Sequence, residues 1–384
     1  QASAPATSPW ANLDPGDIPD DLFAVAWIDL TTGCWGCTYG ADAPNRYDLV
    51  DALGRVVSSF APPIAWDEQS WYSTELLSLV ASGPGRFLVS NLLYTSLGAE
   101  QVVWEADAFA DTATVLARIR ADGVELPLAG VTVPLPIDGW SADERVLPDP
   151  SDPTRLLIVP TSSSPYMPSD FAGLWSVSVT DPESPVRRWT IADLLPAELV
   201  PAAWDAIESP WLVRSADDGS GRLVLGMTGW ATLPGATDKS VRYEPRDVLI
   251  SLDLEAPAAS RWTLPLDGLA VSRELLVVPP GPGQPGTLLW KASYCGNELS
   301  WWEEGATGTL PLPDAQSCPM LGPLLDAPSR TFAYTAWVDE PEFHGAQRVV
   351  ISQGGAELFS LDRLRVGLSE RPFAAIAIAR VPVE

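Results

Sequence analysis

A recurring hairpin pattern constrains the fold of this chain more than any other feature of its sequence. Each copy has an apolar strand, then a turn rich in Pro, Gly, Asp and Ser that is often closed by Arg or Gly, then a very apolar strand. The copies are "LLSLVASGPGRFLVSN" (76–91), "RVLPDPSDPTRLLIVPTS" (145–162), "WLVRSADDGSGRLVLGMTG" (211–229), "LLVVPPGPGQPGTLLWKAS" (275–293), "LLDAPSRTFAYTAW" (324–337) and a weaker "LRVGLSERPFAAIAIARV" (364–381). The repetition predicts an all-β chain built from similar units.

A third strand with alternating apolar and polar residues follows every copy except the last, as in "GLWSVSVTD" (173–181). A fourth strand closes the unit at 186–191 and at 260–266, and these two strands align Trp189 with Trp262. Four strands per unit are typical of β-propeller blades. The apolar second strand suits the buried middle of a blade, and the alternating third strand suits a position nearer the rim.

The turn-plus-strand pattern, clearest in "SADDGSGRLVLG" (215–226), resembles the six-bladed, TolB-like repeat propellers over most of the chain. The last copy has two strands and no chain left for two more, while 22–33 and 47–60 form orphan strands. We therefore expect one blade shared by both ends of the chain, because such closure removes an open sheet edge. Seven blades are the alternative if the N-terminal strands form their own blade. Residues 1–21 are expected to be an acidic, Pro-rich lead, and residues 22–384 a single propeller domain.

The net charge of −27 disfavours nucleic acid as a partner, because such a chain repels phosphate. No apolar run approaches the roughly 20 residues that span a bilayer. The opening "QASAPATSPW" is typical of a mature N-terminus or a tether, and leaves open a signal peptide or lipid anchor before Gln1. We expect a protein of the cell surface, the periplasm or the extracellular space.

Four cysteines bear on the same question, and two of them form Cys34-x-x-Cys37. Turn residues follow this pair in place of the helix that a thioredoxin-like site needs, and the chain has one histidine, His344. We expect two structural disulfides, Cys34–Cys37 and Cys295–Cys318, which suit an oxidising compartment. Free thiols, a redox pair and a metal site are the alternatives.

Carboxylates are the abundant catalytic groups, since the chain lacks a G-x-S-x-G elbow and a P-loop. A glycosidase needs two facing carboxylates about 5 to 9 Å apart. The candidate pairs are Asp67 with Glu68, Glu303 with Glu304, and Asp339 with Glu340. Solvated loop charges are the preferred explanation, because acidic residues occur throughout the chain, so no catalytic residue is assigned. No metal ligand or cofactor is assigned either, although the acidic stretch "DPGDIPDD" (14–21) is a candidate calcium site that lacks EF-hand spacing.

The excess of aromatic residues, with 17 tryptophans, suggests binding. Trp104, Trp175, Trp189 and Trp262 fall in strands, where packing between blades explains them. Aromatic residues in connections, beside acidic residues, suit stacking on a glycan or peptide. The candidate ligand-binding residues are Trp66, Trp71, Tyr72, Trp140, Trp230, Trp301 and Glu303.

These observations predict a non-catalytic β-propeller that binds a protein or an extracellular glycan. The binding face would carry the connections 119–140, 161–172, 230–246 and 337–347. A carboxylate-based enzyme acting on polysaccharide and a structural subunit of an envelope assembly are the alternatives.

Overall fold

The structure is a computed structural model in which part of the chain is described. The described residues are 22–29, 46–51, 55–64, 74–95, 98–120, 122–134, 145–149, 152–159, 173–181, 183–184, 186–190, 193, 206–212, 214–215, 223–232, 243–252, 262–265, 275–278, 286–290, 297–303, 306–312, 321–326, 331–337, 347–354, 356–361 and 373–383.

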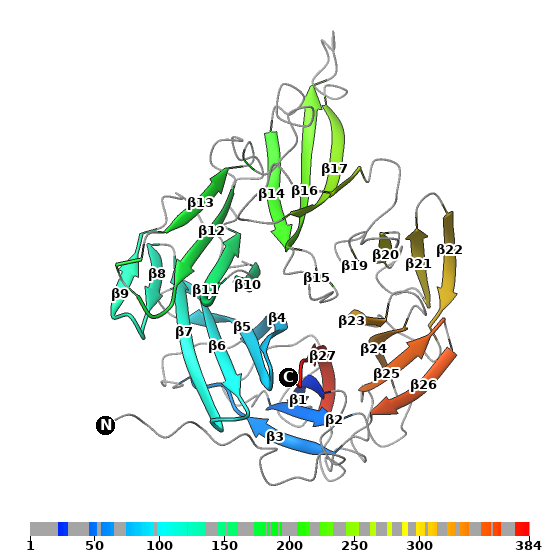
Figure 1. The fold of residues 1–384 in the computed structure, drawn as a ribbon, viewed down its shortest axis with the longest axis horizontal. Coiled ribbons are helices and arrows are strands. Elements are labelled where there is room, and N and C mark those ends of the chain that lie inside the picture. Colours follow the sequence, from blue (N-terminus) through cyan, green and yellow to red (C-terminus); the bar gives the residue numbers. More distant parts are fainter. Residues whose placement is uncertain are drawn as a thin grey trace. The chain divides into compact units, whose positions relative to one another are not determined.

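These residues form 27 β-strands in six sheets, so the chain belongs to the all-β class, as its sequence predicts (Figure 1). The chain divides into two compact units. One comprises Gln1–Arg118, Tyr294–Glu298 and Leu310–Glu384, and the other Ile119–Ser293 and Leu299–Thr309. The expectation of a single domain over 22–384 stays a prediction.

Three of the sheets lie wholly or mainly in the first unit. The first sheet contains, in spatial order, β27 (Phe373–Val381), β1 (Leu22–Asp29), β2 (Arg46–Asp51) and β3 (Val56–Phe60). The second contains β4 (Thr74–Gly83), β5 (Arg86–Thr95), β6 (Gly98–Asp107), β7 (Thr112–Arg120), β8 (Gly123–Leu126) and β9 (Val131–Val133). The third contains β23 (Leu321–Asp326), β24 (Thr331–Trp337), β25 (Gln347–Gln353) and β26 (Ala356–Leu361).

The other three sheets belong mainly to the second unit. One contains β10 (Arg145–Asp149), β11 (Asp152–Val159), β12 (Gly173–Ser178) and β13 (Arg187–Thr190). The next contains β14 (Ala206–Leu212), β16 (Leu223–Thr232), β17 (Tyr243–Leu252) and β18 (Trp262–Pro265). The last contains β15 (Arg214–Ser215), β19 (Leu275–Val278), β20 (Thr287–Trp290), β21 (Glu298–Glu303) and β22 (Ala306–Pro311). The short β15 leaves the hairpin of β14 and β16 and pairs in parallel with β19, which the sequence does not predict.

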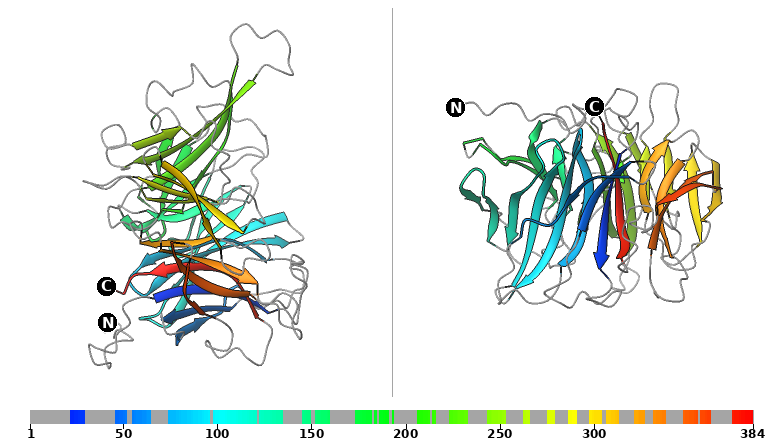
Figure 2. Two further views of the ribbon diagram at one scale, coloured as in Figure 1. Left: turned by 90° about the vertical axis from the view of Figure 1, so that its right-hand side faces the viewer. Right: turned by 90° about the horizontal axis from the view of Figure 1, so that it is seen from below.

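The two ends of the chain meet in one sheet, as predicted. Strand β27 pairs antiparallel with β1, from Leu22 opposite Val381 to Asp29 opposite Phe373. The two strands lie side by side in Figure 2, where β1 is blue and β27 is red. Ile378 and Val381 are almost completely buried, so this pairing seals apolar surface as well as backbone groups.

The division of strands in that sheet differs from the expectation of one strand over 47–60. The structure has the hairpin of β2 and β3 in place of that single strand, so the N-terminal segment supplies three strands, β1, β2 and β3. Asp51 causes the reversal, because its carboxylate accepts hydrogen bonds from the Arg55 backbone N–H (2.8 Å) and from Arg55 Nε (2.5 Å). The Asp51 backbone N–H also donates to the Arg55 carbonyl oxygen at 3.0 Å.

The second strands are buried on both faces, as their sequences predict. Phe87, Leu88 and Val89 follow one another in β5 and are each at most 1% exposed. The alternating third strand β12 is also buried throughout, although a rim position was expected for it. Its alternation has another cause: Ser176 and Ser178 are polar groups that hydrogen-bond inside the protein.

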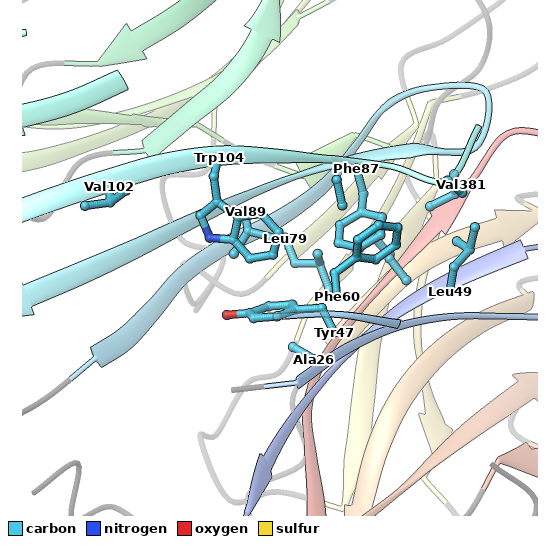
Figure 3. Close-up of a cluster of buried hydrophobic side chains, with 14 of the residues drawn as sticks. Ala26, Tyr47, Leu49, Phe60, Leu79, Phe87, Val89, Val102, Trp104 and Val381 are labelled. Carbon is cyan, nitrogen blue, oxygen red and sulfur yellow. The ribbon is translucent and has the colours of Figure 1, made fainter. Parts of the chain in front are cut away.

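A hydrophobic core lies between the first sheet and the second (Figure 3). Tyr47 packs edge-on against Trp104, with ring centroids 4.9 Å apart, and Phe60 packs edge-on against Phe87 at 5.6 Å. Such pairs add about 0.5 to 1.5 kcal/mol each to the burial of their area. Face-to-face packing of adjacent sheets therefore holds this unit together.

The hairpin β8–β9 is a second departure from the sequence analysis, which treats 119–140 as a connection of the binding face. These strands instead extend the second sheet and bury Val124 and Leu126 completely or nearly so. Gly123 permits the tight packing: its φ is +151°, and a Cβ there would lie 2.5 Å from the Val133 carbonyl oxygen.

Candidate functional site at one end of the sheets

Each four-stranded sheet has two different ends. In a sheet of antiparallel strands that follow one another, the connections from first to second and from third to fourth strand lie at one end, the turn end. The connection from second to third strand and the exit toward the next sheet lie at the opposite end, the loop end. In the sheet of β10 to β13 the turn end carries 150–151 and 179–186, and the loop end carries 160–172 and 191–205.

The longest connections of the chain all belong to loop ends. They are 30–45, 61–73, 160–172 and 191–205. Turn ends include short connections, 84–85, 150–151 and 354–355, as well as longer ones, 179–186, 253–261 and 279–286, and the loop-end connection 96–97 is short. The long connections at the loop ends therefore offer the most residues for binding a ligand.

Most of the predicted ligand-binding residues belong to loop ends by their position in the chain. Trp66, Trp71 and Tyr72 follow β3, and Trp140 follows β9; all four lie outside the described residues. Trp230 was expected in a connection but is part of β16, where it pairs with Ala206 and Pro245 close to the loop end.

Trp301 and Glu303 belong to β21 and do not lie at a loop end, so the structure does not bring them to the same end of a sheet as Trp230. Glu303 ends β21 and pairs with Thr287, the first residue of β20, so it stands at the turn end. The Trp301 indole covers Gly308 of β22, since a Cβ on that glycine would lie 2.7 Å from three indole atoms. An aromatic side chain packed over a cross-strand glycine stabilises a sheet. Trp301 therefore serves its own sheet.

A described polar cluster begins at the loop end of the first sheet. Arg46 opens β2, and its Nε lies 2.7 Å from Asp48 Oδ1. Ser59 of β3 donates to the same oxygen at 2.7 Å and accepts from Arg46 Nη2 at 3.2 Å. The Asp48 side chain is completely buried, whereas that of Arg46 is 34% exposed. This arrangement neutralises the buried carboxylate and presents part of an oriented guanidinium to solvent.

A second oriented arginine, Arg188 of β13, pairs with Trp175 of β12 inside the sheet of β10 to β13. The exposed Arg188 side chain stands over the ring of Trp175, 4.9 Å from its centroid. Trp175 itself is 4% exposed, so the ring fixes the cation and is not itself a stacking surface. The packing role that the sequence suggests for Trp104 and Trp175 is confirmed by their burial.

The groups with displaced pKa values gather at turn ends instead. Burial raises the pKa of the Glu105 carboxyl, against the opposing effects of a hydrogen bond from Ser82 and the charge of Arg86. Burial likewise lowers the pKa of the Arg155 guanidinium. A hydrogen bond from the Thr154 hydroxyl lowers the pKa of Asp152. These three displaced groups thus belong to the scaffold side of their sheets.

The other predicted sites fall on residues that the structure does not describe. Cys34, Cys37, Cys295 and Cys318 are among them, and so is the candidate calcium segment 14–21. Within the described ranges, no three His, Cys, Asp or Glu side chains gather as metal ligands would. Among the same residues, no helix has the length and apolar character needed to cross a membrane.

Comparison with known proteins identifies fold-level similarity at most. No protein-family model matches the sequence, and no curated protein matches it. A GH93 α-L-arabinofuranosidase of Fusarium graminearum, solved with arabinobiose, is 11% identical over 86% of this chain and 98% of its own, with a TM-score of 0.43. AofleA from Arthrobotrys oligospora is 10% identical over 95% of this chain and 90% of its own, with a TM-score of 0.41.

The β-propeller domain of the Trilobed protease from Pyrococcus furiosus is also similar. It is 7% identical over 74% of this chain and 69% of its own, with a TM-score of 0.32. These values are too low for any property of those proteins to be transferred to this chain.

Proposed function

We propose that the chain is a six-bladed β-propeller that binds an extracellular glycan at its loop ends and catalyses no reaction. The observation that carries this proposal is the sheet topology: six sheets of four or more strands, with the four longest connections, 30–45, 61–73, 160–172 and 191–205, all at loop ends. The sheet shared by β27 and β1 supports a closed ring, because pairing the two ends of the chain leaves no blade incomplete.

A glycan is the ligand class that the residues assigned to the loop ends suit best. Trp66, Trp71, Tyr72 and Trp140 would stack on sugar rings, as aromatic side chains do in sites of mixed apolar and polar character. Arg46 is held by partners in its own sheet and would supply oriented hydrogen-bond donors at a loop end. Sugar hydroxyls and uronate carboxylates both accept such bonds.

Binding is preferred to catalysis because three of the described carboxylates have a partner within their own sheet. Asp48 pairs with Arg46, Glu100 with Arg118 at 2.7 Å, and Asp149 accepts from Ser176 at 2.7 Å. A glycosidase pair would instead face an open pocket. The compartment proposed is the cell surface, the periplasm or the extracellular space, where the two proposed disulfides would persist.

Affinity electrophoresis in gels that contain soluble neutral or uronate-bearing polysaccharides tests this proposal. We expect at least one polysaccharide to retard the protein, and the variants Trp71→Ala and Trp140→Ala to weaken retardation about three- to tenfold. The matched control is Trp301→Phe, which alters a tryptophan of β21 that packs over Gly308, and it should bind as the wild type does.

Three results would overturn the proposal in different ways. No retardation by any polysaccharide, with a specific protein captured from the native envelope, would make the ligand a protein. Shortened sugar chains in the gel or in solution would make the chain an enzyme. Equal losses of retardation for Trp71→Ala and Trp301→Phe would show that binding does not depend on the loop-end tryptophans in particular.

A further inference from the structure

Three polar side chains form a chain of hydrogen bonds across β10, β11 and β12, and its arginine also donates from Nη1 to Ser184 Oγ at 2.6 Å. Arg155 of β11 donates from Nε to Ser176 Oγ at 2.8 Å and from Nη2 to the Ser176 carbonyl oxygen at 2.7 Å. Ser176 in turn donates from Oγ to Asp149 Oδ2 of β10 at 2.7 Å. All three residues are at most 2% exposed. The arrangement ties the first strand to the third at the turn end.

The same turn end of β4, β5 and β6 carries a related arrangement. Ser82 of β4 donates to Glu105 Oε1 of β6 at 2.6 Å. Arg86 of β5 faces the other carboxylate oxygen of Glu105, with Nη1 3.8 Å from Oε2. Here too one arginine, one serine and one carboxylate connect three neighbouring strands.

Strand register places Arg86 and Arg155 at equivalent positions of their sheets. It does the same for the third-strand residues Glu105 and Ser176. Arg86 pairs with Asp107, and Arg155 pairs with Ser178. Glu105 and Ser176 each lie two residues before those partners, on the same face of their sheets as the arginine.

The first-strand residues also correspond. The residues before Ser82 and Asp149 are Ala81 and Pro148, which pair with the residues that follow the two arginines, Phe87 and Leu156. In both sheets the register shifts directly after this pair. Ser82 therefore corresponds to Asp149, and Glu105 to Ser176. The arginine is retained between the sheets, whereas the serine and the carboxylate have changed places.

We infer that the turn ends carry a clasp of one arginine, one serine and one carboxylate, in which the serine and the carboxylate can exchange strands. The inference rests on the proposed repeat architecture, because it treats the two sheets as versions of one blade. The exchange is chemically reasonable, since a hydroxyl both donates and accepts. Either order gives the arginine one negative charge and one hydroxyl, so the clasp holds the turn end while the loop end is free to vary.

An exchange experiment in the sheet of β4 to β6 tests the inference on the full chain. Glu105→Ser alone removes the carboxylate that faces Arg86, and Ser82→Asp alone places a second carboxylate beside Glu105. Each single change should raise the unfolding equilibrium constant about tenfold. The double variant, Ser82→Asp with Glu105→Ser, rebuilds the order seen in β10 to β12 and should return to within about threefold of the wild type.

A control exchange uses Glu125 and Thr132, which pair across β8 and β9; Glu125 forms an exposed ion pair with Arg120 at 3.2 Å, of a kind that contributes little to stability. Exchanging these two residues should change the constant by less than about threefold in every variant. A double clasp variant as unstable as the two single changes combined would overturn the inference. Retardation by polysaccharide is measured on the same proteins. If the double variant stays unstable while the protein still binds polysaccharide, the clasp is refuted and the proposed function is not. If the double variant regains stability and no polysaccharide retards the protein, the proposed function is refuted and the clasp is not.

Discussion

Replacing Asn91 should expose how much the core between the first and second sheets depends on one buried amide. Asn91 is completely buried, donates from Nδ2 to the Tyr47 hydroxyl at 3.0 Å and accepts from Trp104 Nε1 at 2.8 Å. The rings that it connects are also in edge-on contact with each other. The variant Asn91→Leu keeps a side chain of similar size and removes both hydrogen bonds.

The expected loss in the free energy of unfolding follows from the buried polar groups that lose their partner. The Trp104 indole N–H stays buried without its acceptor, which costs about 1 to 3 kcal/mol. The bond to Tyr47 contributes about 1 kcal/mol more. We therefore expect the free energy of unfolding to fall by about 2 to 4 kcal/mol.

Urea unfolding followed by tryptophan fluorescence and far-ultraviolet circular dichroism measures this change. The midpoint should move to lower urea, with an unchanged dependence of free energy on urea concentration. Thr112→Val, on an exposed residue of β7, is the control and should change stability by less than about 0.5 kcal/mol. A loss below about 0.5 kcal/mol for Asn91→Leu would refute the argument that this amide supports the core.

Further predictions concern closure, redox state, pH and secondary structure. Deleting residues 372–384 removes β27 and should unfold or aggregate the whole protein; a monomeric product with an unchanged melting temperature would contradict closure by this strand. Thiol titration of denatured, unreduced protein should find no free thiol, and mass mapping should link Cys34 to Cys37 and Cys295 to Cys318; four reactive thiols would contradict this. Because burial raises the pKa of Glu105, its protonated form is favoured in the folded state, so its contribution to stability is largest below the ordinary pKa of 4.5 and declines as pH rises through the raised value. Stability of the wild type relative to Glu105→Gln should therefore fall with rising pH over that interval, and a rising difference would refute the assignment. Circular dichroism should show mainly β structure, and helix above about 30 to 35% would contradict the fold.

Much of the fold follows from the sequence because turns and apolar strands are local signals. Each of the five strong hairpin copies contains two strands that pair in the structure, from β4 with β5 to β23 with β24. The β8–β9 hairpin was missed because its strands are short and Pro127 and Pro134 interrupt the apolar pattern. The split at Asp51 was missed although Asp51 and Gly54 are typical turn residues, because the apolar residues on both sides fit a single strand. A hydrogen bond from the Arg55 backbone N–H to the Asp51 carboxylate adds to this turn.

The site is less predictable, because its residues come from different strands. The sequence places Trp301 beside acidic residues, which suggests ligand binding. It does not reveal that the Trp301 indole packs over Gly308 of the neighbouring strand. The clasp escaped notice for a different reason: its serine and carboxylate change places between sheets, so no position except that of Arg86 and Arg155 repeats. A search for arginine at the start of apolar second strands would have found that position.

The central claim is that six sheets form one closed propeller whose loop ends share a face. A crystal structure or a cryo-EM map of the full chain tests it most directly. We expect six blades around one axis, with β27 and β1 paired in a single blade and the connections 61–73, 160–172 and 191–205 on the same face. Two separate bodies, a seventh blade, or these connections on opposite faces would contradict it.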